Sequence, residues 1–210
     1  VLLEKIDNKK LLKNKYRIVI KKNIPNMAGL GGGSMNAANI LKFMVKKKLI
    51  RVSKDEKFKI AKSIGSDVIL GLYYNNLVLR SDNSIKSFSI KKKFFTLIVK
   101  PNFGCSTKEI YSKIYKFSKS EFKYPTERLF NSKVLVNMKN DLEPIVLANY
   151  PKIDFLKKFL NKLSKTVFVR MTGSGSAIIA YFNSAKKCEE AKKKVNKRFK
   201  NYWCETSKTI

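Results

Sequence analysis

The sequence predicts an α+β protein with two lobes, and three observations support this class. The β-type run Tyr16–Lys22 leads through a glycine-rich loop into an apolar helix. Strands and helices alternate from Phe94 onward, whereas the preceding residues predict helices and a small antiparallel sheet. The lysine run 91–93 interrupts the pattern. We therefore expect two domains, at residues 1–92 and 93–210.

The first lobe is expected to contain two amphipathic helices and the small sheet. Ser34 is a favourable N-cap for the first helix. Its apolar residues recur at helical spacing: Ala37, Ala38, Ile40, Leu41, Met44 and Val45. Ser53–Glu56 is a capping box for a second helix, which ends at Gly65. The sheet is predicted from short apolar runs and a turn: Val68–Leu70, Leu77–Arg80, the turn Ser81–Ser84, and Ile85–Ile90.

The second lobe is expected to begin with a strand at Phe94–Val99. A possible capping box at Ser106–Glu109 starts a helix through Tyr115, and Phe117–Lys133 is expected to be a loop. Later elements follow from caps, breakers and alternation: a helix from the Asn140–Glu143 cap to before Pro151, a helix at 152–163, strands at 166–171 and 177–182 around a glycine turn at 172–176, a helix from the Ser184 cap through Phe199, and a final strand.

Composition places the chain among globular proteins. Its 210 residues can bury a core, and no apolar run approaches the roughly 18–20 residues of a membrane-spanning helix. We find no evident export signal and expect a cytoplasmic setting. Cys105, Cys188 and Cys204 are odd in number and form no Cys-x-x-Cys pair. They therefore predict neither a disulfide framework nor a zinc site.

The net charge of +31, from 46 basic and 15 acidic residues, suggests anionic partners. Most of the basic residues are lysines spread along the whole chain, and runs such as Lys46–Lys48 are expected on solvated helix faces. A base-reading protein more often shows arginine, or aromatic residues interleaved with the charges. We therefore do not expect nucleic acid as the partner.

The most informative local pattern is the glycine-rich loop at residues 25–34. Four of the five residues from Gly29 to Gly33 are glycines, which allow the backbone to approach a ligand closely. An apolar helix follows at once, so its unpaired N-terminal amides and positive dipole end face the loop. A tight strand-to-helix turn would need fewer glycines. The pattern therefore predicts an anion site.

Three familiar phosphate-binding patterns do not fit this loop. A Walker loop ends in Gly-Lys-Ser/Thr, but Gly33 is followed by Ser34 and Met35. The Rossmann pattern needs glycine where Ser34 stands. The protein-kinase signatures His-Arg-Asp and Asp-Phe-Gly are missing, and the chain has no histidine.

Four ordered segments carry a resemblance to one family. Pro25–Ala38 matches Pro-x-x-x-Gly-Leu-Gly-Gly-Gly-Ser-Ser-Asn/Asp-Ala-Ala except at Met35. Gly65–Val68 resembles Gly-Ala-Asp-Val, Asn140–Glu143 matches a family block, and Arg170–Gly175 matches a C-terminal glycine motif. With these segments the chain resembles the GHMP kinases over most of its length.

The resemblance implies a two-lobed fold, with an incomplete N-terminal lobe like a ribosomal protein domain and a ferredoxin-like C-terminal lobe. It implies ATP and Mg²⁺, and phosphorylation of a hydroxyl on an anionic cytidyl diphosphate sugar alcohol. The implied ATP-binding residues are the loop and a preceding lysine: Lys22, Pro25, Asn26, Met27, Ala28, Gly29, Leu30, Gly31, Gly32, Gly33, Ser34 and Met35.

Further roles are also implied by the resemblance. Asp67 would be the catalytic carboxylate and Ser34 a Mg²⁺ ligand. Tyr111 would stack on cytosine, although a core aromatic on a helix fits equally well. The implied residues near the acceptor hydroxyl are Gly173, Ser174 and Gly175, for which an ordinary strand turn is the alternative.

The sequence departs from the family pattern in its loop and at its start, and three alternative functions remain open. Met35 replaces a serine hydroxyl, and the family's opening Pro-Ala-Lys-Ile-Asn-Leu strand and Asp-Gly-Tyr-His segment have no match. We therefore expect a fragment or a divergent form. The alternatives are another family substrate (mevalonate, homoserine or a sugar), a basic RNA-binding module, and an inactive nucleotide binder.

Overall fold

The computed structural model describes residues 1–210 except 10, 81, 83, 90–92, 120–123 and 210. Its contacts divide the chain into two compact units. The first unit comprises Val1–Ile24 and Gly31–Tyr74, and the second comprises Pro25–Leu30 and Asn75–Ile210. The chain therefore changes unit twice around the glycine-rich loop. Among the described helices, none has the length and apolar character needed to cross a membrane.

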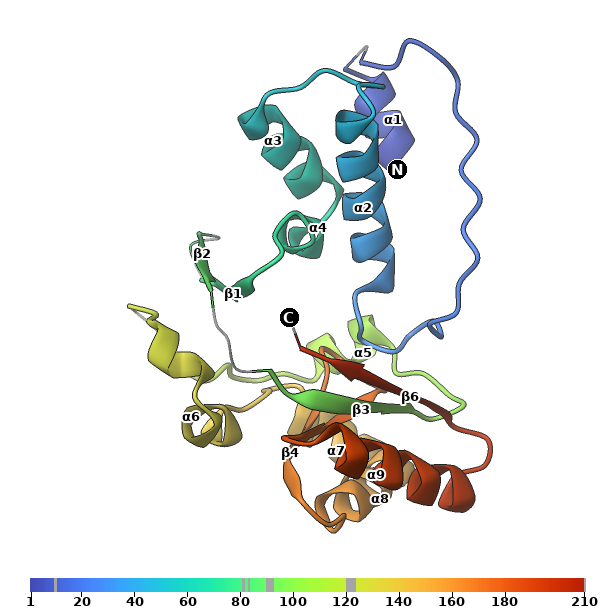
Figure 1. The fold of residues 1–210 in the computed structure, drawn as a ribbon, viewed down its shortest axis with the longest axis vertical. Coiled ribbons are helices and arrows are strands. Elements are labelled where there is room, and N and C mark those ends of the chain that lie inside the picture. The colour runs from blue at the N-terminus through green and yellow to red at the C-terminus, as the bar shows by residue number, and fades with distance from the viewer. Residues whose placement is uncertain (10, 81, 83, 90–92, 120–123, 210) are drawn as a thin grey trace. The chain divides into compact units, whose positions relative to one another are not determined.

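All regular secondary structure in the described part of the first unit is helical (Figure 1). Its helices are α1 Leu2–Asp7, α2 Gly32–Lys46, α3 Lys54–Ile64 and α4 Ser66–Leu70. Each contributes a buried side chain to one core, with Ile6, Leu41, Ile60 and Val68 at most 2% exposed. Helix α1 was not predicted from the sequence. The capping box of α3 is confirmed, because Ser53 and Glu56 bind each other's backbone N–H groups at 3.1 and 2.8 Å.

Two strand predictions in this unit are wrong. Tyr16–Lys22 is not a strand: it has no hydrogen-bonded partner strand among the described residues, and alternating apolar residues alone cannot supply one. Val68–Leu70 belongs to α4, because the Val68 N–H binds the Gly65 carbonyl at 3.1 Å and begins a helical turn. A short apolar run does not distinguish a buried strand from a buried helix.

The second unit begins with the hairpin β1 Asn76–Leu79 and β2 Ile85–Phe88, which pair antiparallel. The predicted turn Ser81–Ser84 lies partly outside the described residues, as does the predicted boundary at 91–93. The division at residues 1–92 and 93–210 stays a prediction. By contacts, the hairpin groups with the residues that follow it.

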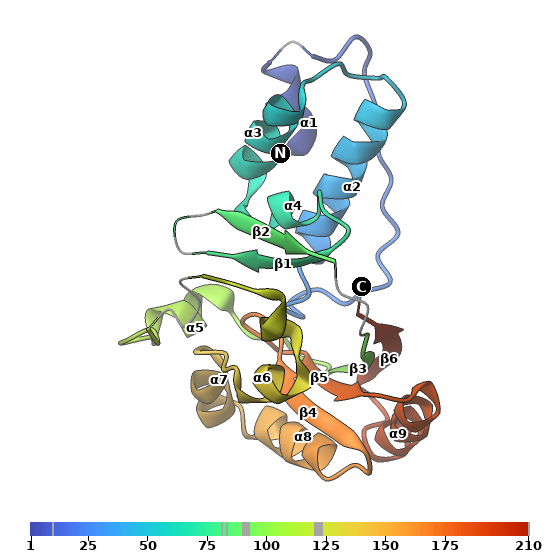
Figure 2. The ribbon, with the colours of Figure 1, turned by 60° about the vertical axis from the view of Figure 1, so that its left-hand side comes forward.

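A four-stranded antiparallel sheet forms the centre of the second unit (Figure 2). Its order is β4-β5-β3-β6, with β3 Phe95–Lys100, β4 Thr166–Met171, β5 Ile178–Phe182 and β6 Trp203–Lys208. Helices α8 Pro151–Asn161 and α9 Ala185–Arg198 pack on it and bury Leu156 and Val195. This order, with its helical connections, is the expected ferredoxin-like topology.

The remaining elements of the second unit are short. They are α5 Thr107–Ser112, the 3₁₀ helix Glu127–Phe130, α6 Ser132–Asn137 and α7 Glu143–Asn149. The helix expected through Tyr115 ends at Ser112, and the expected loop at 117–133 contains the 3₁₀ helix and the first residues of α6. Residues 120–123 of that loop lie outside the described structure. The caps at Ser106 and Ser184 are confirmed by hydrogen bonds from backbone N–H groups of α5 and α9.

Candidate functional site

The glycine-rich loop ends at the N-terminus of α2, where the structure leaves three amides unpaired within the helix. Gly31 is the N-cap and has a φ of +63°, in the left-handed region that favours glycine. The first helical hydrogen bond joins the Met35 N–H to the Gly31 carbonyl at 2.9 Å. The N–H groups of Gly32, Gly33 and Ser34 precede that bond. With the positive end of the helix dipole, they form a position suited to an anion.

Ser34 is not the N-cap that the sequence predicted. The helix begins three residues earlier than expected, because Gly31 adopts the left-handed conformation and turns the chain there. Ser34 is consequently the third helical residue, and no side chain caps this helix end. The hydroxyl and the amide of Ser34 both belong to the first turn.

Glycine is required for different reasons at different points of the loop. A Cβ on Gly29, whose φ is +70°, would lie 2.2 Å from the Thr172 carbonyl oxygen and 2.9 Å from that of Gly175. A Cβ on Gly32 or Gly33 would meet no described heavy atom within 4 Å. Internal packing therefore explains Gly29, whereas the space beside Gly32 and Gly33 can admit a ligand.

The first half of the loop is attached to the second glycine turn within the second unit. Three successive carbonyls, of residues 27–29, accept hydrogen bonds from the Ser176 N–H at 3.3 Å, the Ala177 N–H at 3.2 Å and the Thr172 hydroxyl at 3.0 Å. A Cβ on Gly104 would also lie 2.5 Å from the Met27 Cβ. Residues 27–29 are thus held through their carbonyls. The sequence identified both glycine segments but not their contact.

Met35 contributes packing within the first unit. Its side chain lies against Gly71 at the end of α4, where an added Cβ would be 3.0 Å from the Met35 Cε. Its N–H already donates to Gly31, as described above. The methionine that departs from the family pattern therefore fills space between α2 and α4.

Asp67 is the second residue of α4, and α4 packs against α2 in the first unit. Its side chain is exposed, and it makes no hydrogen bond or ion pair within the described part of the chain. It does not cap α4, since that helix has no side-chain cap. The carboxylate is thus accessible to a ligand. Lys22 is also exposed, in the extended segment before the loop.

The residues implied on the acceptor side all belong to the second unit. The Ser174 Oγ is 2.8 Å from the Thr107 Oγ1 at the start of α5, and Ser174 is 9% exposed. Tyr111 lies one turn further along α5 and is 52% exposed, so it is not a core aromatic. Sequence reasoning missed Thr107, because the capping pattern directed attention to its neighbours Ser106 and Glu109.

Two titratable groups beneath the glycine turn are buried and not poised to react. Lys100 is 5% exposed, its ammonium group donates to the Pro101 and Phe103 carbonyls at 2.8 Å, and burial lowers its pKa. Burial raises the pKa of the Cys105 thiol to about 11. The thiol is therefore neutral near neutral pH, and it serves as a small core group.

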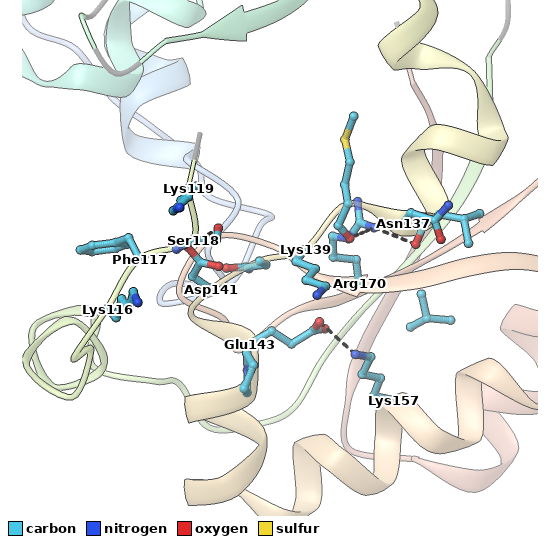
Figure 3. A pocket seen from close by; sticks show the side chains of 15 residues that line it. Lys116, Phe117, Ser118, Lys119, Asn137, Lys139, Asp141, Glu143, Lys157 and Arg170 are labelled. Carbon is cyan, nitrogen blue, oxygen red and sulfur yellow. Dashed lines mark hydrogen bonds and ion pairs between the residues drawn. The ribbon is translucent and has the colours of Figure 1, made fainter. Parts of the chain in front are cut away.

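A separate pocket of about 820 Å³ in the second unit is lined by residues of segments 116–119 and 136–144 and by Lys157, Val169 and Arg170 (Figure 3). Its two acids already have partners. Asp141 accepts from the Ser118 N–H and hydroxyl at 2.9 Å, and Glu143 pairs with Lys157 at 2.9 Å. The Arg170 guanidinium donates to backbone carbonyls of α6 and Met138. The sequence did not predict this pocket.

The glycine-rich helix N-terminus and much of the ferredoxin-like unit fall in two segments that both match family models of one class of kinases. Residues 2–73 match the GHMP kinases N terminal domain, and residues 125–201 match the GHMP kinases C terminal domain. The chain belongs to the GHMP kinase family.

Two curated relatives carry the same name, 4-diphosphocytidyl-2-C-methyl-D-erythritol kinase. The relative from Pelagibacter ubique is 52% identical over 100% of this chain and 75% of its own length. The relative from Thermodesulfovibrio yellowstonii is 31% identical over 95% of this chain and 72% of its own length. The similarity therefore spans nearly all of this chain and about three quarters of each relative.

Solved structures show the same fold at low sequence identity. A crystal structure of 4-(cytidine 5'-diphospho)-2C-methyl-D-erythritol kinase matches with a TM-score of 0.72 and 22% identity, covering 89% of this chain and 68% of that one. The mevalonate kinase of Methanococcus jannaschii matches with a TM-score of 0.68 and 17% identity, covering 99% of this chain and 72% of that one. The expected GHMP kinase fold is confirmed.

Proposed function

We propose that this chain transfers the γ-phosphoryl group of ATP to a hydroxyl of 4-diphosphocytidyl-2-C-methyl-D-erythritol, in the non-mevalonate route to isoprenoids. The names of the relatives that align with nearly the whole chain support this substrate. The observation that carries the kinase assignment is the N-terminus of α2, with its unpaired amides and open space beside Gly32 and Gly33. The reaction is proposed to be cytoplasmic and to involve a small molecule, without nucleic acid.

In this proposal the residues of the glycine-rich loop have two tasks. The amides of residues 32–34 bind ATP phosphate oxygens, and Lys22 adds positive charge. Pro25–Leu30 is proposed to contact the nucleotide as well, and the carbonyls of residues 27–29 are held by the second glycine turn. Mg²⁺ would neutralise phosphate charge, with the Ser34 hydroxyl as the ligand that this chain offers. The accessible first turn of α2 fits a phosphate group.

Asp67 is proposed to orient the acceptor hydroxyl and to accept its proton. Phosphoryl transfer is largely a matter of positioning and charge neutralisation, so a single ionised carboxylate suffices for this task. Its exposure and lack of partners in the described structure support the role. Tyr111 is proposed to stack on the cytosine ring, and Gly173–Gly175 to contact the acceptor.

Asp67→Asn is the sharpest test, because it keeps the size of the side chain and removes the charge. We expect turnover to fall by roughly 10²–10⁴-fold while the dissociation constant for ATP changes little. The measurement is ADP release, coupled to a spectrophotometric signal, with the cytidyl substrate. Melting temperatures should agree between the two proteins, since Asp67 is exposed and supports no internal contact.

The assay compares the cytidyl substrate with mevalonate and homoserine. It uses this chain and a version that carries the family's opening Pro-Ala-Lys-Ile-Asn-Leu segment before Val1. Substrate-dependent ADP release with mevalonate or homoserine alone would replace the proposed acceptor. Absence of ATP-dependent turnover in both proteins with every acceptor would refute the kinase proposal.

A further inference from the structure

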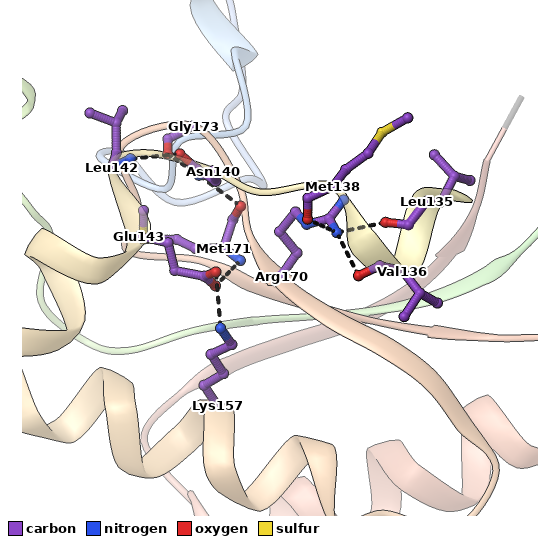
Figure 4. A network of polar contacts seen from close by, with 10 residues as sticks. All are labelled: Leu135, Val136, Met138, Asn140, Leu142, Glu143, Lys157, Arg170, Met171 and Gly173. Carbon is purple, nitrogen blue, oxygen red and sulfur yellow. Dashed lines mark hydrogen bonds and ion pairs between the residues drawn. The ribbon is translucent and has the colours of Figure 1, made fainter. Parts of the chain in front are cut away.

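The Asn140–Glu143 block matched the family pattern but has no part in the proposed chemistry. In the structure its polar side chains bind backbone groups (Figure 4). The Asn140 Nδ2 donates to the Met171 carbonyl at 3.1 Å and to the Gly173 carbonyl at 2.8 Å. The Asn140 Oδ1 accepts from the Leu142 N–H at 3.0 Å. One amide side chain therefore fastens the block to the end of β4 and to the second glycine turn.

Glu143 makes a second attachment, to the last residue of β4 before this turn. Its Oε1 accepts from the Met171 N–H at 2.8 Å, and its Oε2 pairs with the Lys157 Nζ at 2.9 Å. Glu143 is 9% exposed, so its carboxylate is held with little access to water. Asn140 and Glu143 together bind both backbone polar groups of Met171.

The opposite side of the turn has almost no free space against the first glycine loop. The Thr172 hydroxyl holds the Gly29 carbonyl at 3.0 Å. A Cβ on Gly29 would lie 2.2 Å from the Thr172 carbonyl oxygen, and a Cβ on Gly173 would lie 3.1 Å from the Gly29 carbonyl oxygen. Atoms packed this closely leave no free space between the turn and the loop. A displacement of the turn therefore moves the loop as well.

We propose that Asn140 and Glu143 are positioning residues that set the place of the loop segment Pro25–Leu30. They act through Met171 and the second glycine turn, which their side chains bind. The proposal rests on the proposed function in one respect, namely that this segment shapes the ATP site. Loss of either attachment lets the turn and loop shift together, and a shift near 1 Å is enough to weaken binding strongly.

The first test is Asn140→Ala with Asn149→Ala as its control. Asn149 also makes two side-chain hydrogen bonds, one with the Lys113 ammonium and one with the Ile145 carbonyl, but neither involves the turn. We expect Asn140→Ala to raise the dissociation constant for Mg-ATP by about tenfold or more. Asn149→Ala should leave it within about twofold. Calorimetric titration with ATP on the full chain measures both.

Glu143 variants separate positioning from general stabilisation. Glu143→Gln keeps an oxygen that can accept from the Met171 N–H, so it should retain ATP affinity even if breaking the Lys157 pair lowers the melting temperature. Glu143→Ala removes the acceptor and should weaken ATP binding as Asn140→Ala does. Equal affinity losses in both Glu143 variants would contradict the positioning role.

Hydrogen exchange provides a readout that does not depend on ATP. The Ser176 and Ala177 amides donate to loop carbonyls. Their exchange rates should therefore be higher in Asn140→Ala than in the wild type, and the same as in the wild type in Asn149→Ala. If the wild-type chain binds no ATP but these amides respond as expected, the proposed function fails and the positioning stands. Unchanged exchange in a folded Asn140→Ala protein would overturn the inference. Should that variant not fold, Glu143→Ala and Glu143→Gln give the same comparison.

Discussion

Gly29 and Gly33 are four residues apart in one loop, yet they meet different physical requirements. Gly29 needs a positive φ and has carbonyl oxygens of the second glycine turn against it. Gly33 has helical geometry and open space. The sequence shows two identical residues here. Only the atoms around them distinguish a packing requirement from space that a ligand can use.

Alanine at these two positions should therefore have opposite effects. Gly29→Ala is expected to lower the melting temperature, because its Cβ collides with the backbone at 2.2 Å. Gly33→Ala should leave the melting temperature unchanged or raise it, since alanine is favoured over glycine in helices by up to about 1 kcal/mol. Gly33→Ala should nevertheless weaken ATP binding, because its methyl group occupies the approach to the amides. Thermal melts and ATP titrations measure both effects, and a Gly33→Ala protein with full affinity would contradict the phosphate site.

Residue-level prediction succeeded where the chemistry is local and failed where a distant partner decides. The Ser53 and Ser184 caps follow from residues within one turn, and both are confirmed. Ser34 was expected to be a cap by the same logic, but Gly31 turned the chain first. Thr107 was not identified at all, because its partner Ser174 is 67 residues away.

At the scale of elements, helices were more predictable than strands. Helices α2, α3, α8 and α9 were all predicted, and the caps of α3 and α9 were correct, because a helix forms its hydrogen bonds within itself. The alternating run Tyr16–Lys22 lacked a partner strand in the described structure, so alternation was not enough. The five-residue helix α4 was mistaken for a strand, since so short an apolar run has no clear period.

The capping box of α3 offers a direct test at this scale. Ser53→Ala removes the hydroxyl that accepts from the Glu56 N–H and should lower the free energy of unfolding by about 1 kcal/mol. Ser63→Ala, near the other end of the helix, is the matched control and should change stability little. Urea unfolding followed by helical circular dichroism measures the difference. An equal decrease in the free energy of unfolding in the two variants would show that the Ser53 cap does not stabilise the helix.

The whole chain carries a net charge of +31, and the proposed substrates are both anionic. Such a field raises the local concentration of anions and is screened by salt, with a Debye length of about 10 Å at 0.1 M and 3 Å at 1 M. The composition alone implied this attraction. It does not identify a site, because lysines occur throughout the sequence.

We therefore expect the KM for ATP to rise several-fold between roughly 0.05 and 0.5 M potassium chloride, with a smaller change in kcat. Screening weakens the approach of the anion but does not alter the bound geometry. Initial-rate measurements at each salt concentration test this, with sucrose at equal osmolality as a control for general solution effects. A KM independent of salt would show that the charge has no part in substrate capture.

The sequence by itself determined the family, the two-lobed class, the main helices and the glycine loop, because these depend on local periodicity, caps and ordered motifs. Tertiary structure alone decided which glycine is packed and which is open, that Met35 fills space, and that Asn140 and Glu143 hold the second glycine turn. Those properties arise from contacts between residues up to 146 positions apart, as in the packing of Gly29 against Gly175. Only the folded chain brings such residues within hydrogen-bonding or van der Waals distance.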